Sequence, residues 1–172
     1  MVRTEKNYFS VLVKHNTCRV DCTGIFASEE TCFMRPRSLE FTVKIESLDL
    51  DENGWLINFR DIKNILRTMG KKIEGKVLVP AKCRYLSVGT TPSGVCLSKE
   101  NMLYEFEKSS CEIMDTENCE VEYLAKYVCE EIVTKLTMQS LRDRNVTKVQ
   151  IRCEELPQLK SGIYEVEIPY NT

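Results

Sequence analysis

Two amphipathic helical segments, set between runs of alternating residues, restrict the folds open to this chain. Apolar residues recur at helical spacing in residues 58–70 and again in residues 120–136, which predicts two helices with one buried face each. The segments around them alternate apolar and polar residues, the period of a half-buried strand. The first stripe comprises Phe59, Ile62, Leu66 and Met69, and the second comprises Val121, Leu124, Ala125, Val128, Ile132 and Leu136.

The resulting element order is β-β-α-β-β-β-α-β-β. This order predicts an α+β fold, with an antiparallel β-sheet and two helices on one face. A sheet of this kind has edge strands that need protection, and closure of several subunits into a shared barrel is one solution. We expect a single domain over residues 1–172 with an inserted β-hairpin region at about 76–107.

The first extended segment changes face along its length. Its apolar residues stand at odd positions in residues 9–13 and at even positions in residues 18–22, so we expect a bulge or bend near residues 15–17. Residues 23–37 read as irregular. A strand is predicted to follow, because four apolar residues alternate there: Leu39, Phe41, Val43 and Ile45.

Local signals mark the ends of the first helix. Asn58 is a suitable N-cap, and Asp61 places a negative charge in the first turn, where it interacts favourably with the helix dipole. Gly70 is predicted to end this helix, because glycine favours the position after the last helical turn.

Charge and hydropathy exclude several classes of protein. The chain of 172 residues has a formal net charge of −2, which gives no general attraction to nucleic acid or to anionic membranes. It contains no apolar stretch of about 18 residues that could span a membrane, and its N-terminus lacks the apolar core of a signal peptide. We therefore expect a cytoplasmic protein without nucleic-acid or membrane partners.

The nine cysteines form no CxxC pair, and in a reducing compartment they are most simply free thiols. A structural zinc site is the alternative, because His15, Cys18, Cys22 and Cys32 are soft ligands within one short region. Their spacings are not those of a standard zinc module.

Arg35 and Arg37 flank Pro36 where the strand containing Leu39 is expected to begin. Arginine stays protonated and offers no lone pair to a metal, but two guanidinium groups can receive a phosphate or carboxylate. The alternative is that both project into solvent or pair with Glu29, Glu30 or Glu40.

Four segments in the correct order resemble the 6-pyruvoyl-tetrahydropterin synthase and 6-carboxytetrahydropterin synthase family. DENGWLINFRDIKNIL resembles the family's turn and first helix, and IEGKVLVPA resembles the segment that follows, in the form typical of archaeal members. ENCEVEYLAKYV resembles the opening of the second helix, and VQIRCEELPQLKSGIY resembles a late strand, loop and strand. The matching positions are Asp51, Gly54, Leu56, Ile57, Asn58, Phe59, Ile62 and Lys63, then Asn118, Glu122, Leu124, Ala125 and Tyr127, then Val149 or Ile151, Glu155 and Tyr164.

This resemblance implies the tunnelling (T-) fold, in which trimers close into a barrel and two trimers often stack into a hexamer. It also implies a pterin site between subunits, where a buried glutamate binds the amino-pyrimidine edge through parallel hydrogen bonds. Glu155 is the candidate for that role. Glu122 is a second candidate, although it also suits the N-terminus of a helix for its charge alone.

The chain departs from the family at the zinc site. The family binds catalytic zinc through three histidines, whereas this chain has one histidine. The first zinc position falls near Asp21, and the other two fall on Arg35 and Arg37. The family's acid/base histidine is also absent. Cys32 corresponds to the cysteine that works with this histidine on proton transfers. Two nearby guanidinium groups can lower the pKa of its thiol, and the alternative is an ordinary thiol in a loop.

These features leave three functions open. The first is a carbon–oxygen (phosphate-eliminating) lyase acting on dihydroneopterin triphosphate, which the missing zinc ligands and acid/base histidine disfavour, since such groups contribute strongly to this kind of chemistry. The second, which we favour, is a zinc-free relative that binds a pterin- or purine-like ligand between subunits of a trimer or hexamer. The third is a non-catalytic scaffold.

Overall fold

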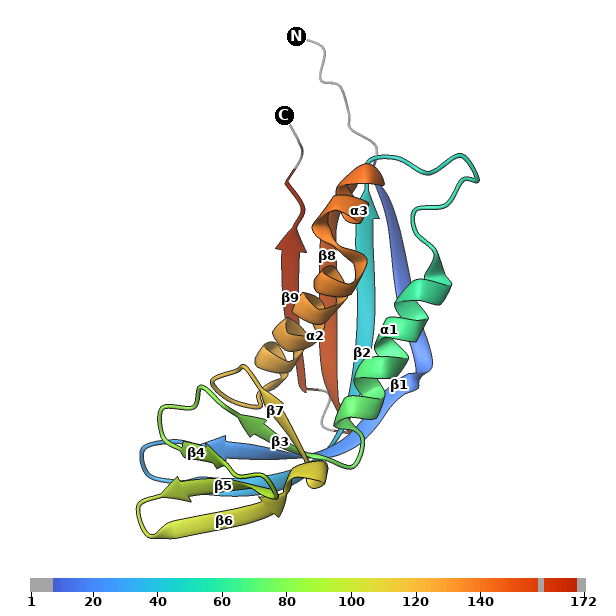
Figure 1. Cartoon of the computed structure of the whole chain (residues 1–172). Helices are drawn as coiled ribbons and strands as arrows, with labels where there is room; N and C mark the ends of the chain where they lie inside the picture. The colour runs from blue at the N-terminus through green and yellow to red at the C-terminus, as the bar shows by residue number, and fades with distance from the viewer. Residues whose placement is uncertain (1–7, 158–159, 170–172) are drawn as a thin grey trace.

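Six strands form one mixed β-sheet in the order β7-β3-β1-β2-β8-β9 (Figure 1). The computed structural model describes residues 8–157 and 160–169, with the side chains of residues 15–18 outside the description. Strands β1, β2, β8 and β9 pair antiparallel, whereas β3 runs parallel to β1, and β7 parallel to β3. The strands are β1 (Phe9–Ala27), β2 (Cys32–Ser47), β3 (Val77–Pro80), β7 (Cys111–Met114), β8 (Val146–Leu156) and β9 (Lys160–Glu167).

Two long helices cover one face of this sheet, as the sequence predicts (Figure 1). They are α1 (Phe59–Ile73) and α2 (Val121–Leu136), and the short α3 (Met138–Asp143) follows α2 directly. The α+β prediction is thus confirmed. The sequence does not predict the two parallel strand pairs or α3. Each of them involves only about four to six residues and lacks a clear periodic pattern. None of the described helices has the length and apolar character needed to span a membrane.

A second sheet packs against the other side of the β1–β2 ribbon. Neighbouring residues of a strand point to opposite faces, so Phe26 joins the main core under the helices while Ile25 joins a second core. This second core contains Val79, Val95 and Leu97. Its sheet has the order β4-β5-β6. Its strands are β4 (Ser87–Thr90), β5 (Gly94–Lys99) and β6 (Met102–Glu107), followed by a 3-10 turn, η1 (Lys108–Ser110). The inserted β-hairpin region at about 76–107 stays a prediction. Within it, β3 belongs to the main sheet, and β4, β5 and β6 form the second sheet.

The β1–β2 ribbon is longer than the sequence pattern indicates. The bulge is confirmed, because the pairing register shifts between Lys14 and Arg19. The irregular segment is wrong: residues 23–27 continue β1, and β2 already begins at Cys32. Pairing with the partner strands overrides the weak strand propensity of this glycine- and proline-containing stretch. Arg35 and Arg37 therefore lie within a strand and not at its mouth.

The first helix also extends further than predicted. Its N-cap is confirmed, since the Asn58 side chain accepts a hydrogen bond of 3.0 Å from the Arg60 backbone N–H. Gly70 lies buried inside the helix, which ends at Ile73, and Gly75 takes the positive φ of 68° after it. Phe59 is 48% exposed, so it does not belong to the buried face.

Candidate functional site

Arg35, Arg37 and Glu155 form one ion-pair cluster within a single chain. Glu155 on β8 lies opposite Leu39 on β2, and residues directly opposite in a strand pair share a face of the sheet. Arg35 and Arg37 share that face because they stand four and two residues, respectively, before Leu39. The Arg35 guanidinium binds the carboxylate as a fork, with Nη1 2.9 Å from Oε1 and Nη2 3.1 Å from Oε2. Arg37 Nη2 lies 2.7 Å from Oε2.

The three side chains differ sharply in their access to solvent. Arg37 is 0% exposed and Glu155 is 3% exposed, whereas Arg35 is 32% exposed. Burial raises the pKa of Glu155, but the hydrogen bonds and charges of Arg37 and Arg35 outweigh it and hold that pKa below its ordinary value. Glu155 is therefore a carboxylate at neutral pH. Two guanidinium groups, those of Arg35 and Arg37, face this carboxylate.

An aromatic ring and the start of α2 complete the cluster. Arg37 Nη1 donates a hydrogen bond to the carbonyl of Cys119, which precedes α2. Both guanidinium groups lie over the ring of Phe26. The distance from Cζ to the ring centroid is 5.3 Å for Arg35 and 5.2 Å for Arg37. Phe33, which is 50% exposed, stacks against the same ring, with 5.3 Å between the two ring centroids. Arg37 Nε is buried and has no acceptor among the described residues, which leaves one donor of the cluster unsatisfied.

Gly24 makes room for this arrangement. It lies opposite Arg35 on the neighbouring strand. A Cβ atom at this position would lie 2.9 Å from the Phe26 ring and 3.1 Å from Cδ of Arg37. The sequence reading missed Phe26, Gly24 and Cys119. A glycine inside an alternating segment signals a close approach and is the clue that was available.

Asp21 does not join the two arginines. It lies opposite Ser38 and accepts a hydrogen bond from its hydroxyl, on the exposed face of the ribbon. The residue of β1 that lies opposite Arg37 is the buried Cys22. The expected convergence of Asp21 with Arg35 and Arg37 is therefore not met, since a shift of one residue along a strand reverses the face.

Cys32 also lies apart from the cluster. It pairs with Ala27 at the end of the hairpin. Because Cys32 lies three residues before Arg35 on the same strand, the two side chains point to opposite faces. Burial raises the pKa of its thiol, and the opposing charge comes from Lys99 and not from the arginines. The Lys99 ammonium is itself bound to backbone carbonyls of the hairpin turn, 2.8 Å from that of Glu29. This environment favours the thiol and provides little activation.

Glu122 stands exposed in the first turn of α2. Its backbone is in close contact with β9, because a Cβ atom on Gly162 would lie 2.4 Å from the Glu122 nitrogen. This position fits a favourable interaction with the helix dipole.

The two residues that the resemblance assigns to zinc positions, Arg35 and Arg37, offer no lone pair to a metal, and both are engaged by Glu155. At these two positions the side chains do not fit a zinc site. No group of three or more histidine, cysteine or carboxylate side chains suited to a metal occurs in residues 8–157 and 160–169 as far as they are described. For the alternative site, Cys22 and Cys32 lie on opposite faces of the ribbon, and the side chains of His15 and Cys18 are outside the described part.

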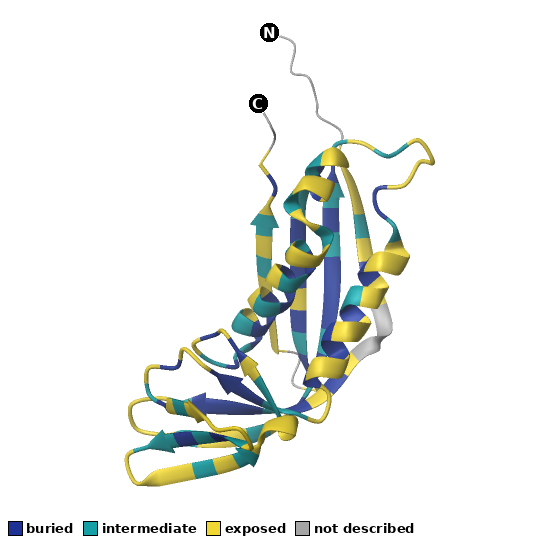
Figure 2. Cartoon of the chain, in the orientation of Figure 1, coloured by how far each residue is buried: buried dark blue, intermediate teal, exposed yellow. Residues whose placement is uncertain are grey.

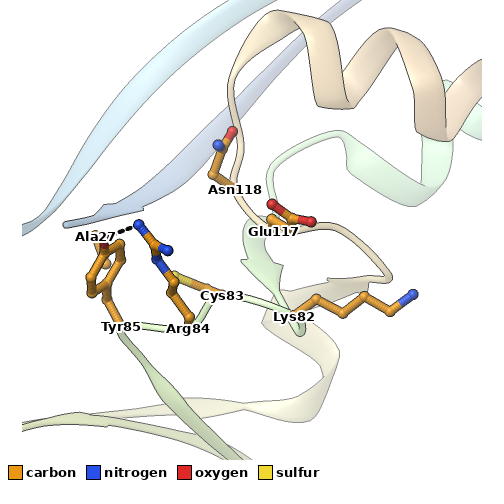
Figure 3. Close-up of a pocket in the computed structure, with 7 residues that line it drawn as sticks. All are labelled: Ala27, Lys82, Cys83, Arg84, Tyr85, Glu117 and Asn118. Atoms are coloured by element: carbon orange, nitrogen blue, oxygen red, sulfur yellow. Dashed lines mark hydrogen bonds between the residues drawn. The ribbon is translucent and has the colours of Figure 1, made fainter. Parts of the chain in front are cut away.

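A pocket of about 520 Å³ opens elsewhere, between the end of β1, the loop before β4 and the loop before α2 (Figure 3). Its cations are already engaged: Lys82 pairs with Asp115 at 2.8 Å, and Arg84 stacks on Tyr85 and bonds its hydroxyl. None of the predicted site residues lines this pocket, whose walls are Ala27, Lys82, Cys83, Arg84, Tyr85, Glu117 and Asn118.

A mixed sheet with two helices on one face, carrying a buried glutamate on the strand after the second helix, defines a T-fold protein of the pterin-synthase type. The family model described as 6-pyruvoyl tetrahydropterin synthase matches residues 37–165, well over half of the chain. The chain therefore belongs to the 6-pyruvoyl tetrahydropterin synthase family.

Solved structures agree with this assignment at the level of the fold. The 6-pyruvoyl tetrahydropterin synthase of Plasmodium vivax superposes with a TM-score of 0.86 at 16% identity, over 94% of this chain and 99% of that chain. The Plasmodium falciparum enzyme gives the same values. A P. vivax variant whose catalytic glutamate is replaced by cysteine has a TM-score of 0.85 at 16% identity, over the same shares of both chains. A comparison with curated protein sequences finds no match.

Proposed function

We propose that this chain is a zinc-independent member of its family that binds a pterin- or purine-like ligand through Glu155. The observation that supports this function best is the ionised, buried carboxylate of Glu155, which already accepts a planar fork of N–H groups. A pterin or guanine ring presents a similar pair of parallel donors. The cluster also offers the ring of Phe26, against which a planar ligand can stack.

Lyase activity on dihydroneopterin triphosphate is the alternative. The solved neighbours are 6-pyruvoyl tetrahydropterin synthases, and family membership supports this chemistry. Against it stands the residue content of the site: Arg35 and Arg37 cannot ligate zinc, and Cys32 lies on the far face of the ribbon. We derive no reaction step for this chain.

A scaffold without ligand is the second candidate, and one observation favours it. Both oxygens of Glu155 have partners within the chain, and the side chain is 3% exposed. Under this function the cluster only stabilises the packing of β2, β8 and the start of α2.

A homo-oligomer, trimeric or hexameric, belongs to the proposal. Pairing of β2 with β8 ends at Ser38, so among the described residues the segment 32–37 has a strand neighbour on the β1 side alone. An open edge of this kind favours pairing with another copy, which would place the ligand at a subunit interface. We propose a cytoplasmic location for the assembly, without nucleic-acid or membrane partners.

The test measures zinc, ligand and turnover on one preparation. The protein is purified without added metal, its zinc content is determined, and binding of pterin and turnover of dihydroneopterin triphosphate are measured. Glu155→Gln is compared with Glu154→Gln, a neighbouring carboxylate that pairs with Arg152 instead.

We expect substoichiometric zinc, no turnover, and pterin binding that Glu155→Gln abolishes and Glu154→Gln preserves. Stoichiometric zinc with turnover would establish the lyase. Absence of binding by a folded oligomer would support the scaffold.

A further inference from the structure

We infer that Arg35 is a resident occupant of the ligand position at Glu155, which a planar ligand with a guanidine-like edge must displace. This inference rests on the proposed function and adds to it the group that the site recognises and the residue that competes for it. It begins from the different positions of the two arginines in the cluster.

Arg37 has the features of a permanent member. Its side chain is 0% exposed, it binds one oxygen of Glu155, and it also donates to the Cys119 carbonyl. Removing it would leave a carbonyl and a carboxylate short of a partner in a buried place. A ligand therefore meets Arg37 as part of the wall.

Arg35 has the features of an exchangeable member. Its side chain is 32% exposed, so the guanidinium can regain water when it leaves the carboxylate. Its fork occupies both oxygens of Glu155, and its Cζ atom lies over the Phe26 ring, 5.3 Å from the ring centroid. The position of Arg35 thus combines two recognition elements, a carboxylate that accepts two parallel N–H bonds and an aromatic face.

A neutral ring with a guanidine-like edge can satisfy both elements. Its ring nitrogen and exocyclic amine replace the two N–H groups of Arg35, and its plane replaces the guanidinium over Phe26.

A ligand can bind Glu155 only in the molecules that Arg35 has left. Arg35 therefore weakens the apparent affinity for the ligand, and the effect grows with the fraction of molecules in which it occupies Glu155.

The probe is pterin, and lumazine is the control ligand because an oxygen replaces the exocyclic amine. The variants are Arg35→Met, Arg35→Lys and the double variant Arg35→Met/Glu155→Gln. Arg152→Met is the matched control, since Arg152 pairs with Glu154 at 3.1 Å on the opposite face of the sheet.

Fluorescence titration of the oligomer gives the affinities, with circular dichroism and gel filtration to verify the fold. We expect Arg35→Met to bind pterin about tenfold or more tightly than the unmodified protein, and Arg35→Lys to show a smaller gain because it loses the fork. Arg152→Met should leave the affinity unchanged. Lumazine should show no gain, and the double variant should not bind pterin.

Each contrary result has a distinct meaning. If pterin binds in a Glu155-dependent way but Arg35→Met brings no gain, the resident occupant is overturned while the proposed function stands. If no folded variant binds pterin, both fail. If Arg35→Met and Arg35→Lys do not fold, Arg35 is a structural tie and the inference is overturned.

Discussion

Arg37 Nη2 lies 2.7 Å from Oε2 of Glu155, with both side chains withdrawn from solvent. The two residues are separated by 118 positions in the sequence, and their contact joins β2 to β8 near the last register of that strand pair. The same guanidinium reaches the loop before α2 through the Cys119 carbonyl. This ion pair therefore connects β2, β8 and the loop before α2. Buried parts of the main sheet are dark blue in Figure 2.

Loss of Arg37 should destabilise the fold. Arg37→Met leaves the Glu155 carboxylate buried with Arg35 as its remaining partner. We expect the free energy of unfolding to fall by about 3 kcal/mol, at the low end for a broken buried pair. Urea denaturation measures the change. In Arg37→Met/Glu155→Leu the loss should be smaller than the sum of the single losses, and strict additivity would contradict the coupling.

Acid should remove the contribution of Glu155 to stability. Its pKa is lowered in the folded state from an ordinary value of 4.5, so its stabilisation is present above that ordinary value and is lost as the pH falls through the lowered folded value. Urea denaturation between neutral pH and about pH 3 should show a steeper acid loss for the unmodified protein than for Glu155→Gln. Parallel curves would show that the ion pairs do not lower this pKa.

Close contact between β9 and α2 should make Gly162 intolerant of a side chain. A Cβ atom there would meet backbone atoms of Val121 and Glu122 at 2.6 Å and 2.4 Å. Gly162→Ala should lower the free energy of unfolding by about 1–3 kcal/mol. Gly89→Ala is the control, because its nearest atom is 3.9 Å away. Equal thermal stability of the two variants would contradict the close packing.

The cysteines should react according to burial. Burial raises the pKa of Cys22 and of Cys119 to about 12, and the nearby positive charge of Arg37 does not offset it. Iodoacetamide at about pH 7.5 should therefore spare both in the native protein, while the half-buried Cys32, Cys96 and Cys111 react before them. Peptide mass spectrometry locates the label. Rapid native labelling of Cys22 would show that the ribbon opens near Arg37.

Much of the architecture follows from local patterns. Both long helices, the Asn58 cap and the bulge in β1 are where the periodicity and capping rules predict them. The strand over residues 23–27 and the short β7 were missed because partner strands stabilise them, and not their own alternation. Phe59 has helical spacing but lies at the exposed start of α1.

The sequence predicts the residues of the candidate site but not their arrangement. It indicates Glu155, Arg35 and Arg37 separately, and it offers Glu29, Glu30 and Glu40 as acidic partners for the arginines. Their actual partner is Glu155 of the same chain. The resemblance to the family predicts Asp21 beside them, whereas the strand register puts it on the other face.

The alternation of residues alone determines that Arg35, Arg37 and Leu39 share one face of a strand, because the side-chain period of a strand is two residues. That these arginines stand where the family has histidines is a prediction from the resemblance to the family and not from the alternation. Tertiary structure decides which strand lies alongside. Since β8 pairs with β2 across more than 100 positions of sequence, the partner of each arginine depends on long-range packing and register, which no local pattern specifies.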